Sequence, residues 1–382
     1  MMASMTSRER VLAALGHEET DRVPIDFGGC YSTGIYFTAY DRLKDFLGLE
    51  HETVIGRRMT RCVTIDESVL RRFEVDTRLL ALGAYEGVGH QREIDADSYA
   101  DELGAVWRKT GAGPYLNVDG PFYGKTVSLG DLETHRWPDP DDPGYYRGLR
   151  ERARALRESG DCAIILNLPS GVVHTSQWLR GYETWLKDLY KNRDFACRLM
   201  ELITDWWVRV ADNALDAVGD SIDITNFGDD LGTQNSTVFD PRIYRELVKP
   251  HHARMFAAIK ARTDAKTLFH SCGAVSALID DFIDIGIDVI NPVQVRARNM
   301  EPERLKAEYG DRISFWGAID TQRVLPLGTP EEVRAEVRRV ADILGRGGGY
   351  VLNSVHNIQA DVPPENIAAM FDEARTYRPN GS

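Results

Sequence analysis

Residues 266–291 read KTLFHSCGAVSALIDDFIDIGIDVIN. The apolar run that ends at Phe269 predicts a strand, the apolar periodicity over 274–285 predicts a helix, and residues 288–291 predict a second strand. This strand–helix–strand order is typical of a parallel βαβ unit. The turn between the first strand and the helix contains His270 and Cys272. A histidine and a cysteine two residues apart can bind one Zn²⁺ together, because imidazole and thiolate are both zinc ligands.

The same alternation of strands and helices extends over the whole chain. Further strands are predicted at 21–27, 73–80, 162–167, 221–227, 313–318 and 349–353, with helical patterns between them. About eight strands in this order predict an α/β fold, a (β/α)8 or TIM barrel, with residues 1–382 forming a single barrel domain. Residues 83–127 are Gly-rich with alternating stretches and predict an early β-hairpin insertion. A doubly wound open sheet is the alternative, and it is less favoured because no Gly-rich phosphate-binding loop follows a strand.

The amino-acid composition excludes some classes of partner and indicates the cellular compartment. The 46 Lys and Arg residues against 59 Asp and Glu residues give a net charge of −13, which argues against nucleic acid or an anionic membrane as partner. The five cysteines are odd in number and dispersed, as in proteins of a reducing cytosol. The sequence contains neither a signal-type apolar start nor an apolar run of about 18 residues. We therefore expect a soluble, cytoplasmic protein.

Polar residues follow most of the predicted strands. In a (β/α)8 barrel the carboxyl ends of the strands form the active-site face. Partly buried polar groups gathered there need a metal or a polar ligand as partner, although a strand-terminal Asp or Asn can also cap the next helix. The remaining histidines, His174 among them, have no partner spacing and are interpreted as structural or surface residues. The residues assigned to the active-site face are Asp26, Asp76, Asn167, Asn226, Asp229, Asp230, His270, Cys272, Asn291, Asp320, Asn353 and His356.

Several of these segments are similar to one known family. The chain resembles the uroporphyrinogen decarboxylase superfamily, which also contains the cobamide-dependent methyltransferases, over nearly its whole length. His270-Ser271-Cys272 resembles the His-x-Cys zinc motif of the methyltransferases, which the decarboxylases lack. The resemblance also implies a homodimer. The segments that carry it are 228–234 (GDDLGTQ), 269–273 (FHSCG), 291–294 (NPVQ), 315–320 (FWGAID) and 352–358 (LNSVHNI).

The chain departs from both branches of this family at one place each. The decarboxylases bind the substrate carboxylates through an Arg-rich N-terminal motif, and the matching residues 25–31 (IDFGGCY) contain no arginine. The third zinc ligand of the methyltransferases is a cysteine near the end of the last strand, and no cysteine follows Cys272 here. His356 occupies that neighbourhood and is the expected third ligand, with Asp229 or Asp230 as an alternative.

The resemblance implies a zinc-dependent methyltransferase that moves a methyl group between a small O- or S-linked substrate, the methyl donor or acceptor, and a corrinoid protein. A metal-free porphyrinogen decarboxylase, in which Asp76 matches the catalytic aspartate, is one alternative. A non-catalytic barrel that binds a small ligand or a corrinoid protein is another. The expected roles are zinc binding by His270, Cys272 and His356, catalysis by Asp76, Asp229, Asp230 and Asp320, and substrate binding by Asn167, Asn291, Gln294 and Asn353.

Overall fold

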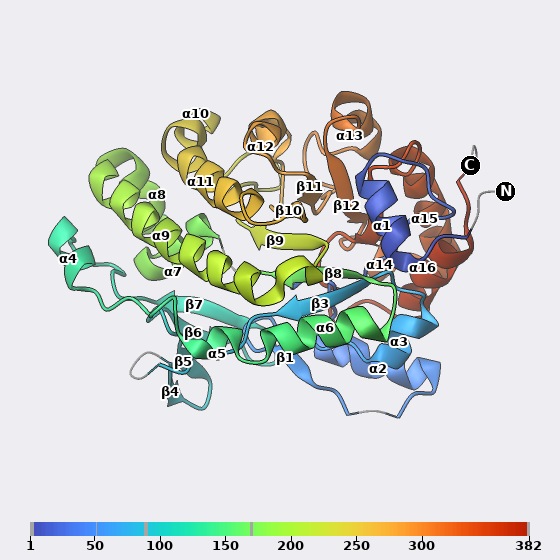
Figure 1. The fold of residues 1–382 in the computed structure, drawn as a ribbon, viewed down its shortest axis with the longest axis horizontal. Helices are drawn as coiled ribbons and strands as arrows, with labels where there is room; N and C mark the ends of the chain where they lie inside the picture. Colours follow the sequence, from blue (N-terminus) through green and yellow to red (C-terminus); the bar gives the residue numbers. More distant parts are fainter. Residues whose placement is uncertain (1–3, 51, 88–90, 169–170, 380–382) are drawn as a thin grey trace.

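One curved parallel sheet forms the centre of the molecule (Figure 1). The computed structural model describes residues 4–50, 52–87, 91–168 and 171–379. Neighbouring strands follow the order β13-β12-β11-β10-β9-β8-β3, and all six pairs are parallel. The strands are β3 (Thr77–Ala81), β8 (Ala163–Asn167), β9 (Ile224–Gly228), β10 (Lys266–His270), β11 (Val289–Asn291), β12 (Ser314–Ile319) and β13 (Tyr350–Ser354).

A short segment around Ile25 links the two edges of this sheet. Ile25 forms a parallel bridge with Leu352 of β13. The backbone N–H of Asp76, just before β3, donates to the carbonyl oxygen of Ile25 at 2.8 Å. This segment therefore takes the eighth position of the barrel, although the strand predicted over 21–27 is reduced to a single bridge. The predicted α/β barrel architecture is confirmed.

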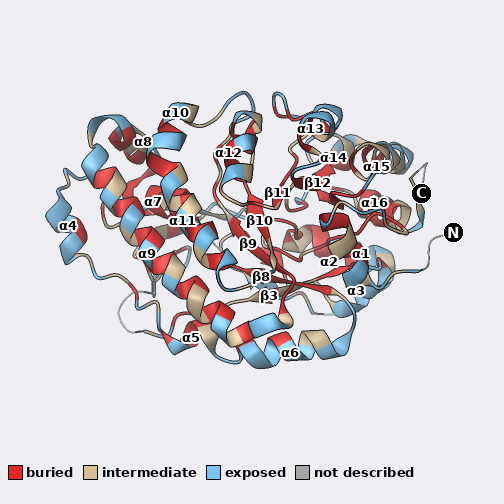
Figure 2. Ribbon diagram, turned by 45° about the horizontal axis from the view of Figure 1, so that its top comes forward, coloured by how far each residue is buried: buried red, intermediate tan, exposed pale blue. Residues whose placement is uncertain are grey.

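Helices cover the outside of the curved sheet and turn their buried faces toward it (Figure 2). Capping boxes at Thr6 and Thr329 start two of them, because each threonine hydroxyl accepts a backbone N–H that the helix leaves unpaired. The helices are α1 (Ser7–Leu15), α2 (Phe37–Leu47), α3 (Glu67–Arg72), α4 (Leu129–Thr134), α5 (Pro143–Tyr146), α6 (Leu149–Ser159), α7 (Val172–Arg180), α8 (Tyr182–Lys191), α9 (Arg193–Val218), α10 (Pro241–Ile243), α11 (Lys249–Lys260), α12 (Ile279–Asp284), α13 (Pro302–Tyr309), α14 (Val324–Leu327), α15 (Pro330–Leu344) and α16 (Pro364–Thr376), and a π-helical segment spans Tyr244–Val248.

The barrel interior is a closed apolar core. Val11 and Leu15 of α1 pack there against residues at the amino-terminal ends of the strands, so α1 closes that end. On the six strands β8 to β13, inward residues of this core alternate with outward apolar residues that pack under the helices. The site must then lie at the other, carboxyl end. The strand residues of this inner core are Ala163, Ile165, Ile224, Leu268, Val289, Trp316 and Val351.

A second sheet lies between β3 and α4 in the chain. Its strands β4 (Arg92–Asp95), β5 (Ser98–Ala100), β6 (Val106–Lys109) and β7 (Tyr115–Asp119) pair antiparallel in sequence order. The insertion predicted over 83–127 thus contains four strands rather than one hairpin, and its residues 88–90 lie outside the described residues. Trp107 of β6 meets Trp178 of α7 edge to face at 5.0 Å between ring centroids. The insertion therefore packs against the barrel. A separate two-stranded ribbon, β1 (Ile55–Arg57) with β2 (Cys62–Val63), precedes α3.

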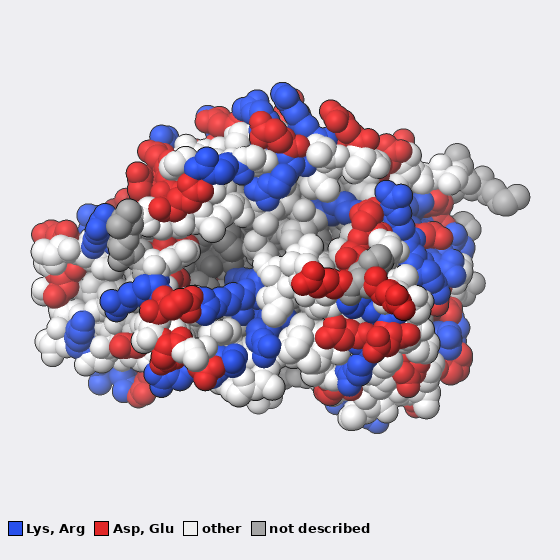
Figure 3. Space-filling view, turned by 90° about the horizontal axis from the view of Figure 1, so that it is seen from below, with Lys and Arg blue, Asp and Glu red and all other residues white. Residues whose placement is uncertain are grey.

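Charged side chains of both signs are intermixed on the surface. On the face shown in Figure 3, basic and acidic side chains lie beside one another around a hollow. Within the ranges that the structure describes, no helix has the length and apolar character needed to cross a bilayer.

Candidate metal centre

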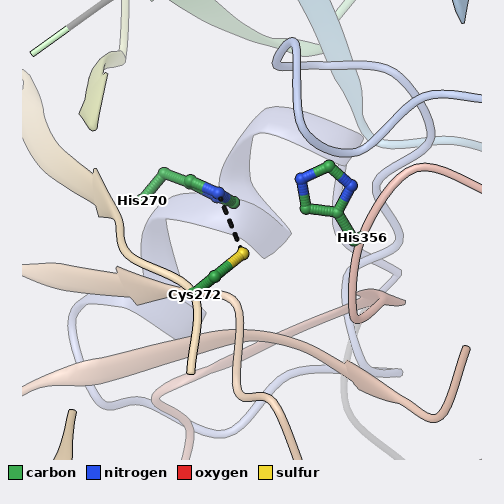
Figure 4. A group of neighbouring side chains, drawn as sticks. All are labelled: His270, Cys272 and His356. Atoms are coloured by element: carbon green, nitrogen blue, oxygen red, sulfur yellow. Dashed lines mark hydrogen bonds between the residues drawn. The ribbon is translucent and has the colours of Figure 1, made fainter. Parts of the chain in front are cut away.

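Three side chains converge at the carboxyl end of the barrel (Figure 4). His270 ends β10, Cys272 follows two residues later, and His356 lies two residues beyond β13. Strands β11 and β12 separate β10 from β13, so the curvature of the sheet brings the three residues together. One ligand atom from each residue lies within 4.8 Å of the others. The three predicted metal ligands therefore form one cluster.

The His270–Cys272 pair in this cluster has the ligand spacing of a zinc ion. Nitrogen and sulfur ligands at the usual zinc distances of about 2.0–2.3 Å are about 3.5 Å apart on a tetrahedral ion. The Cys272 Sγ and His270 Nε2 atoms are 3.4 Å apart. A His₂Cys donor set leaves a fourth position for a substrate, as catalytic zinc sites do.

Asn291 determines which nitrogen of His270 faces the cluster. The Asn291 side-chain amide donates to the Trp316 carbonyl oxygen at 3.3 Å, which fixes the direction of its carbonyl oxygen. That oxygen accepts from His270 Nδ1 at 2.6 Å. The proton is therefore on Nδ1, and the lone pair of Nε2 is left for a metal. Asn291 is fully buried, so it orients a ligand rather than touching a substrate.

Burial sets the protonation of the cluster. Burial, with the nearby charge of His270, lowers the pKa of His356 to about 4. Burial first, and then the charge of Asp230, raises the pKa of the Cys272 thiol well above its ordinary value. At neutral pH the imidazole of His356 is therefore available as a ligand, and a bound cation would displace the thiol proton.

A cavity of about 340 Å³ adjoins the cluster. Both histidines of the cluster line it, and the second sheet contributes part of its wall. This volume is near the lower end of the range for ligand pockets, about 300–1,000 Å³. The other residues that line it are a mixture of apolar or aromatic and polar or charged residues: Tyr31, Ser32, Arg57, Met59, Thr60, Trp107, Pro114, Tyr115, Leu116, Asn117, Leu168, His174, Trp178, Asn226, Gly228, Asp230 and Asn357.

Asp230 lies between the cavity and the cluster. Its Oδ1 atom accepts from the backbone N–H of Cys272 at 2.9 Å and lies 3.5 Å from His270 Nε2. Its Oδ2 atom is 3.5 Å from His174 Nε2. Burial opposes ionisation, but the hydrogen bond and charge of His174, together with the charge of His270, hold the pKa of Asp230 well below its ordinary range. Asp230 is an ionised carboxylate at the cavity wall.

Asp229 points away from the cavity. Its carboxylate accepts from the backbone N–H groups of Val173 and His174 at 3.0 and 2.7 Å, at the start of α7. It also accepts from His252 Nε2 at 2.9 Å. Fully buried and satisfied in this way, Asp229 fixes the start of α7, and the catalytic role expected for it has no geometric support.

The amide side chains predicted to bind the substrate form hydrogen bonds within the protein. Asn167 accepts from Asn226, which lines the cavity, at 2.9 Å. The Gln294 side-chain oxygen accepts from the backbone N–H of Gly273 at 2.7 Å and holds the turn after Cys272. Asn353 is fully buried and donates to the carbonyl oxygen of Asp26 at 2.6 Å. These side chains position backbone and neighbouring side chains.

Asp320 is separated from the cluster. It accepts from the backbone N–H of Gln322 at 2.8 Å, as a capping residue does after a strand. It lines another cavity, between α13 and α15, together with Arg296 and Arg323. Among the acidic residues predicted as catalytic, Asp230 alone lines the cavity beside the cluster.

Asp76 was placed at the wrong end of its strand. β3 starts at Thr77, so Asp76 lies at the amino-terminal end of the barrel. Its carboxylate contacts the Arg10 and Arg22 guanidinium groups at 2.7 and 2.6 Å, and all three side chains are buried. Asp76 is therefore part of a buried ion-pair cluster that ties α1 to the sheet, and it is not a residue of the candidate site.

The sequence patterns missed two basic residues of the cavity, Arg57 and His174. Arg57 ends the short strand β1, and His174 lies in the first turn of α7, where its ring stacks on Trp178 at 3° and 5.5 Å between centroids. His174 was interpreted as structural or surface and instead lines the cavity. Its place in the loop-and-helix segment after β8, on the carboxyl face, was the one indication available from the sequence.

Fold and site together define a (β/α)-barrel protein with a small cavity and a His₂Cys candidate metal centre at its carboxyl-end face. The sequence profile of uroporphyrinogen decarboxylase (URO-D) matches residues 115–377. The chain belongs to this family, as the sequence motifs indicated.

Curated relatives and a solved structure agree with this assignment. The chain is 31% identical to a uroporphyrinogen decarboxylase from Psychromonas ingrahamii over 95% of both chains. It is 25% identical to the protein of the same name from Alkalilimnicola ehrlichii over 98% of this chain and 96% of the relative. A methyltransferase from Methanosarcina mazei has the same fold, with a TM-score of 0.64 and 18% identity over 97% of this chain and 99% of that one.

Proposed function

We propose that the protein is a zinc-dependent methyltransferase that moves a methyl group between a small O- or S-linked substrate and a corrinoid protein. The convergence of His270, Cys272 and His356 within 4.8 Å beside a cavity carries the proposal. A zinc ion held by these side chains would supply Lewis acidity to the substrate oxygen or sulfur. Family membership and the shared fold of a methyltransferase support the proposal.

The other residues prepare the site for this chemistry. Asn291 keeps His270 in the tautomer that presents Nε2. Asp230 remains ionised beside the cluster and orients polar groups of the substrate. The Gln294 hydrogen bond to Gly273 holds the turn that presents Cys272. The apolar and aromatic side chains of the cavity wall would restrict water around the reacting group.

The size of the cavity indicates how the corrinoid would reach the site. A space of about 340 Å³ holds a small substrate and leaves no room for a corrinoid as well. The corrinoid would therefore be presented at the cavity mouth by another protein. We extend the proposal to a homodimer working in the cytoplasm, where a free cysteine such as Cys272 stays reduced.

The relatives' shared name favours one second candidate, a decarboxylase of the porphyrinogen type. A polycarboxylate substrate calls for several guanidinium groups. Among the described residues that line the cavity there is a single arginine, Arg57. Asp76, the expected electrostatic stabiliser, lies at the opposite end of the barrel in a buried ion-pair cluster. Both observations rank this candidate second.

Methyl transfer to and from free cobalamin tests the proposal. Tag-free, zinc-loaded protein is mixed with methylcobalamin and a panel of thiols, or with cob(I)alamin and a panel of methyl ethers, while the cobalt absorbance is followed. We expect zinc-dependent transfer that Cys272→Ala abolishes and that Cys197→Ala, a half-buried cysteine of α9, retains. Transfer that survives chelation, or no transfer with any member of the panels, would contradict the proposal. Decarboxylation of uroporphyrinogen in a parallel incubation would reverse the ranking.

A further inference from the structure

Arg57 places one positive charge in the cavity. It ends β1 and pairs in register with Cys62 of β2, and its carbonyl oxygen accepts from the backbone N–H of Arg61 at 2.9 Å. Its guanidinium carbon lies 4.6 Å from the centre of the Tyr31 ring. Strand pairing thus fixes the backbone, and the aromatic ring supports the guanidinium plane.

Arg57 lines the same cavity as His174, His270 and His356. Arg57 is half-buried, and burial lowers the pKa of its guanidinium group. A guanidinium in such surroundings binds a carboxylate or similar anion strongly, through two parallel N–H···O hydrogen bonds.

Four aromatic side chains contribute flat surfaces to the cavity wall. Tyr31, Trp107, Tyr115 and Trp178 all line it. Aromatic faces attract another ring by offset or edge-to-face contact beyond the burial of its area. A cavity of about 340 Å³ suits a ligand of one small ring rather than a fused polycycle.

We propose that Arg57 binds the anionic group of a substrate whose body is a flat aromatic ring, held between Tyr31, Trp107, Tyr115 and Trp178. This proposal rests on the proposed function in one respect. If the protein is a methyltransferase, the methyl-bearing atom of this substrate would point toward His270, Cys272 and His356. Recognition of the anion and of the ring needs neither the metal nor the methyl group.

Binding of three simple probes tests this proposal separately from methyl transfer. Benzoate carries both features, benzamide lacks the charge, and cyclohexanecarboxylate lacks the flat ring. By titration calorimetry of the full chain, we expect benzoate to bind at least about tenfold more tightly than benzamide, the usual range for a hydrogen bond to a charged group. We also expect it to bind several-fold more tightly than cyclohexanecarboxylate. Equal binding of benzoate and benzamide, or no binding of benzoate at millimolar concentration, would overturn the anion site. Equal binding of the two carboxylates would overturn the aromatic one.

Neighbouring arginines provide matched variants. Arg57→Gln should remove the preference for benzoate over benzamide. Arg58→Gln should retain it, because Arg58 does not line this cavity, is 44% exposed and pairs with Glu93. Arg57→Lys keeps the charge without the planar fork and should bind benzoate with intermediate affinity, which provides a second test if Arg57→Gln fails to fold. Benzoate binding that is unchanged in folded Arg57→Gln would show that the anion binds elsewhere, for example at the metal cluster.

Discussion

Asn291 shows how one buried side chain prepares the metal centre. Its carbonyl oxygen accepts from His270 Nδ1 at 2.6 Å and from the Ser32 hydroxyl at 3.1 Å, and its amide donates to the backbone of β12. These contacts fix the ring orientation and the tautomer of His270 before any metal arrives. Mutation of a hydrogen-bond partner of a metal-binding histidine typically lowers metal affinity about 10- to 100-fold.

Replacing Asn291 by alanine should therefore weaken zinc binding by about 10- to 100-fold. Competition with a chromophoric chelator measures the affinity. Asn366→Ala serves as the control, because Asn366 is a similarly buried asparagine whose amide donates to the backbone carbonyl oxygens of Leu325 and Gly328. If Asn291→Ala binds zinc as tightly as the natural chain, the orienting role assigned to Asn291 is wrong.

Asp76 contributes to the stability of the barrel. Removing its carboxylate leaves Arg10 and Arg22 buried without their shared anion. We expect Asp76→Ala to lower the free energy of unfolding by about 3–5 kcal/mol, measured by urea denaturation. Zinc content of the folded variant should be unchanged. A variant of natural stability that lost zinc or substrate binding would instead return Asp76 to the site.

Among the elements, the inserted sheet contributes most to the site beyond the barrel strands. Trp107 of β6 and Tyr115 of β7 form part of the cavity wall. The turn between β5 and β6 is organised by Asp101, which accepts from the backbone N–H groups of Leu103 and Ala105 and from Trp107 Nε1 at 2.8–3.0 Å. Alternation of residue types predicted antiparallel strands here. The number of strands was not predictable, because short half-exposed strands carry little periodicity.

Asp101 should make the stability of the chain depend on pH. Burial, together with the charge of Glu102, raises the pKa of Asp101 to about 7, whereas the unfolded value is near 3.9. Between about pH 4 and 7 the folded state therefore binds more protons than the unfolded state. The contribution of Asp101 to stability is full below that range and is lost as the pH rises through it. Urea denaturation at several pH values should give a shallower decline for Asp101→Asn than for the natural chain. Identical pH slopes would contradict the raised pKa.

Over the whole molecule, the predictable features are those encoded by local periodicity. Buried apolar runs such as 162–167 and capped helices such as the one after Thr329 were found, and their alternation predicted the barrel. The rule that sites lie at strand ends brought His270, Cys272 and His356 together. The same rule misplaced Asp76. The strand that was predicted to begin at residue 73 begins at Thr77, so Asp76 lies at its amino-terminal end. Arg57 was missed because tertiary packing of a short ribbon, rather than local pattern, brings it to the cavity.

The core and the metal centre are spatially distinct, which leads to a prediction for the whole chain. The apolar interior of the barrel is closed by α1, and the cluster lies at the opposite end. We expect the metal-free protein to remain folded, with zinc raising the free energy of unfolding by about 2.7 kcal/mol at a hundredfold excess over Kd. Thermal denaturation with zinc and with a chelator measures this shift. Unfolding on chelation, or no shift with zinc, would contradict a separate site on a pre-formed barrel.

At the metal centre, we expect one zinc ion to bind to His270, Cys272 and His356. X-ray absorption at the zinc edge on tag-free protein tests it most directly. We predict one zinc per chain, with one sulfur at about 2.3 Å and two imidazole nitrogens at about 2.0–2.1 Å in its shell. His356→Ala should remove one imidazole from that shell. Absence of zinc after loading, or a zinc shell without sulfur, would contradict the claim.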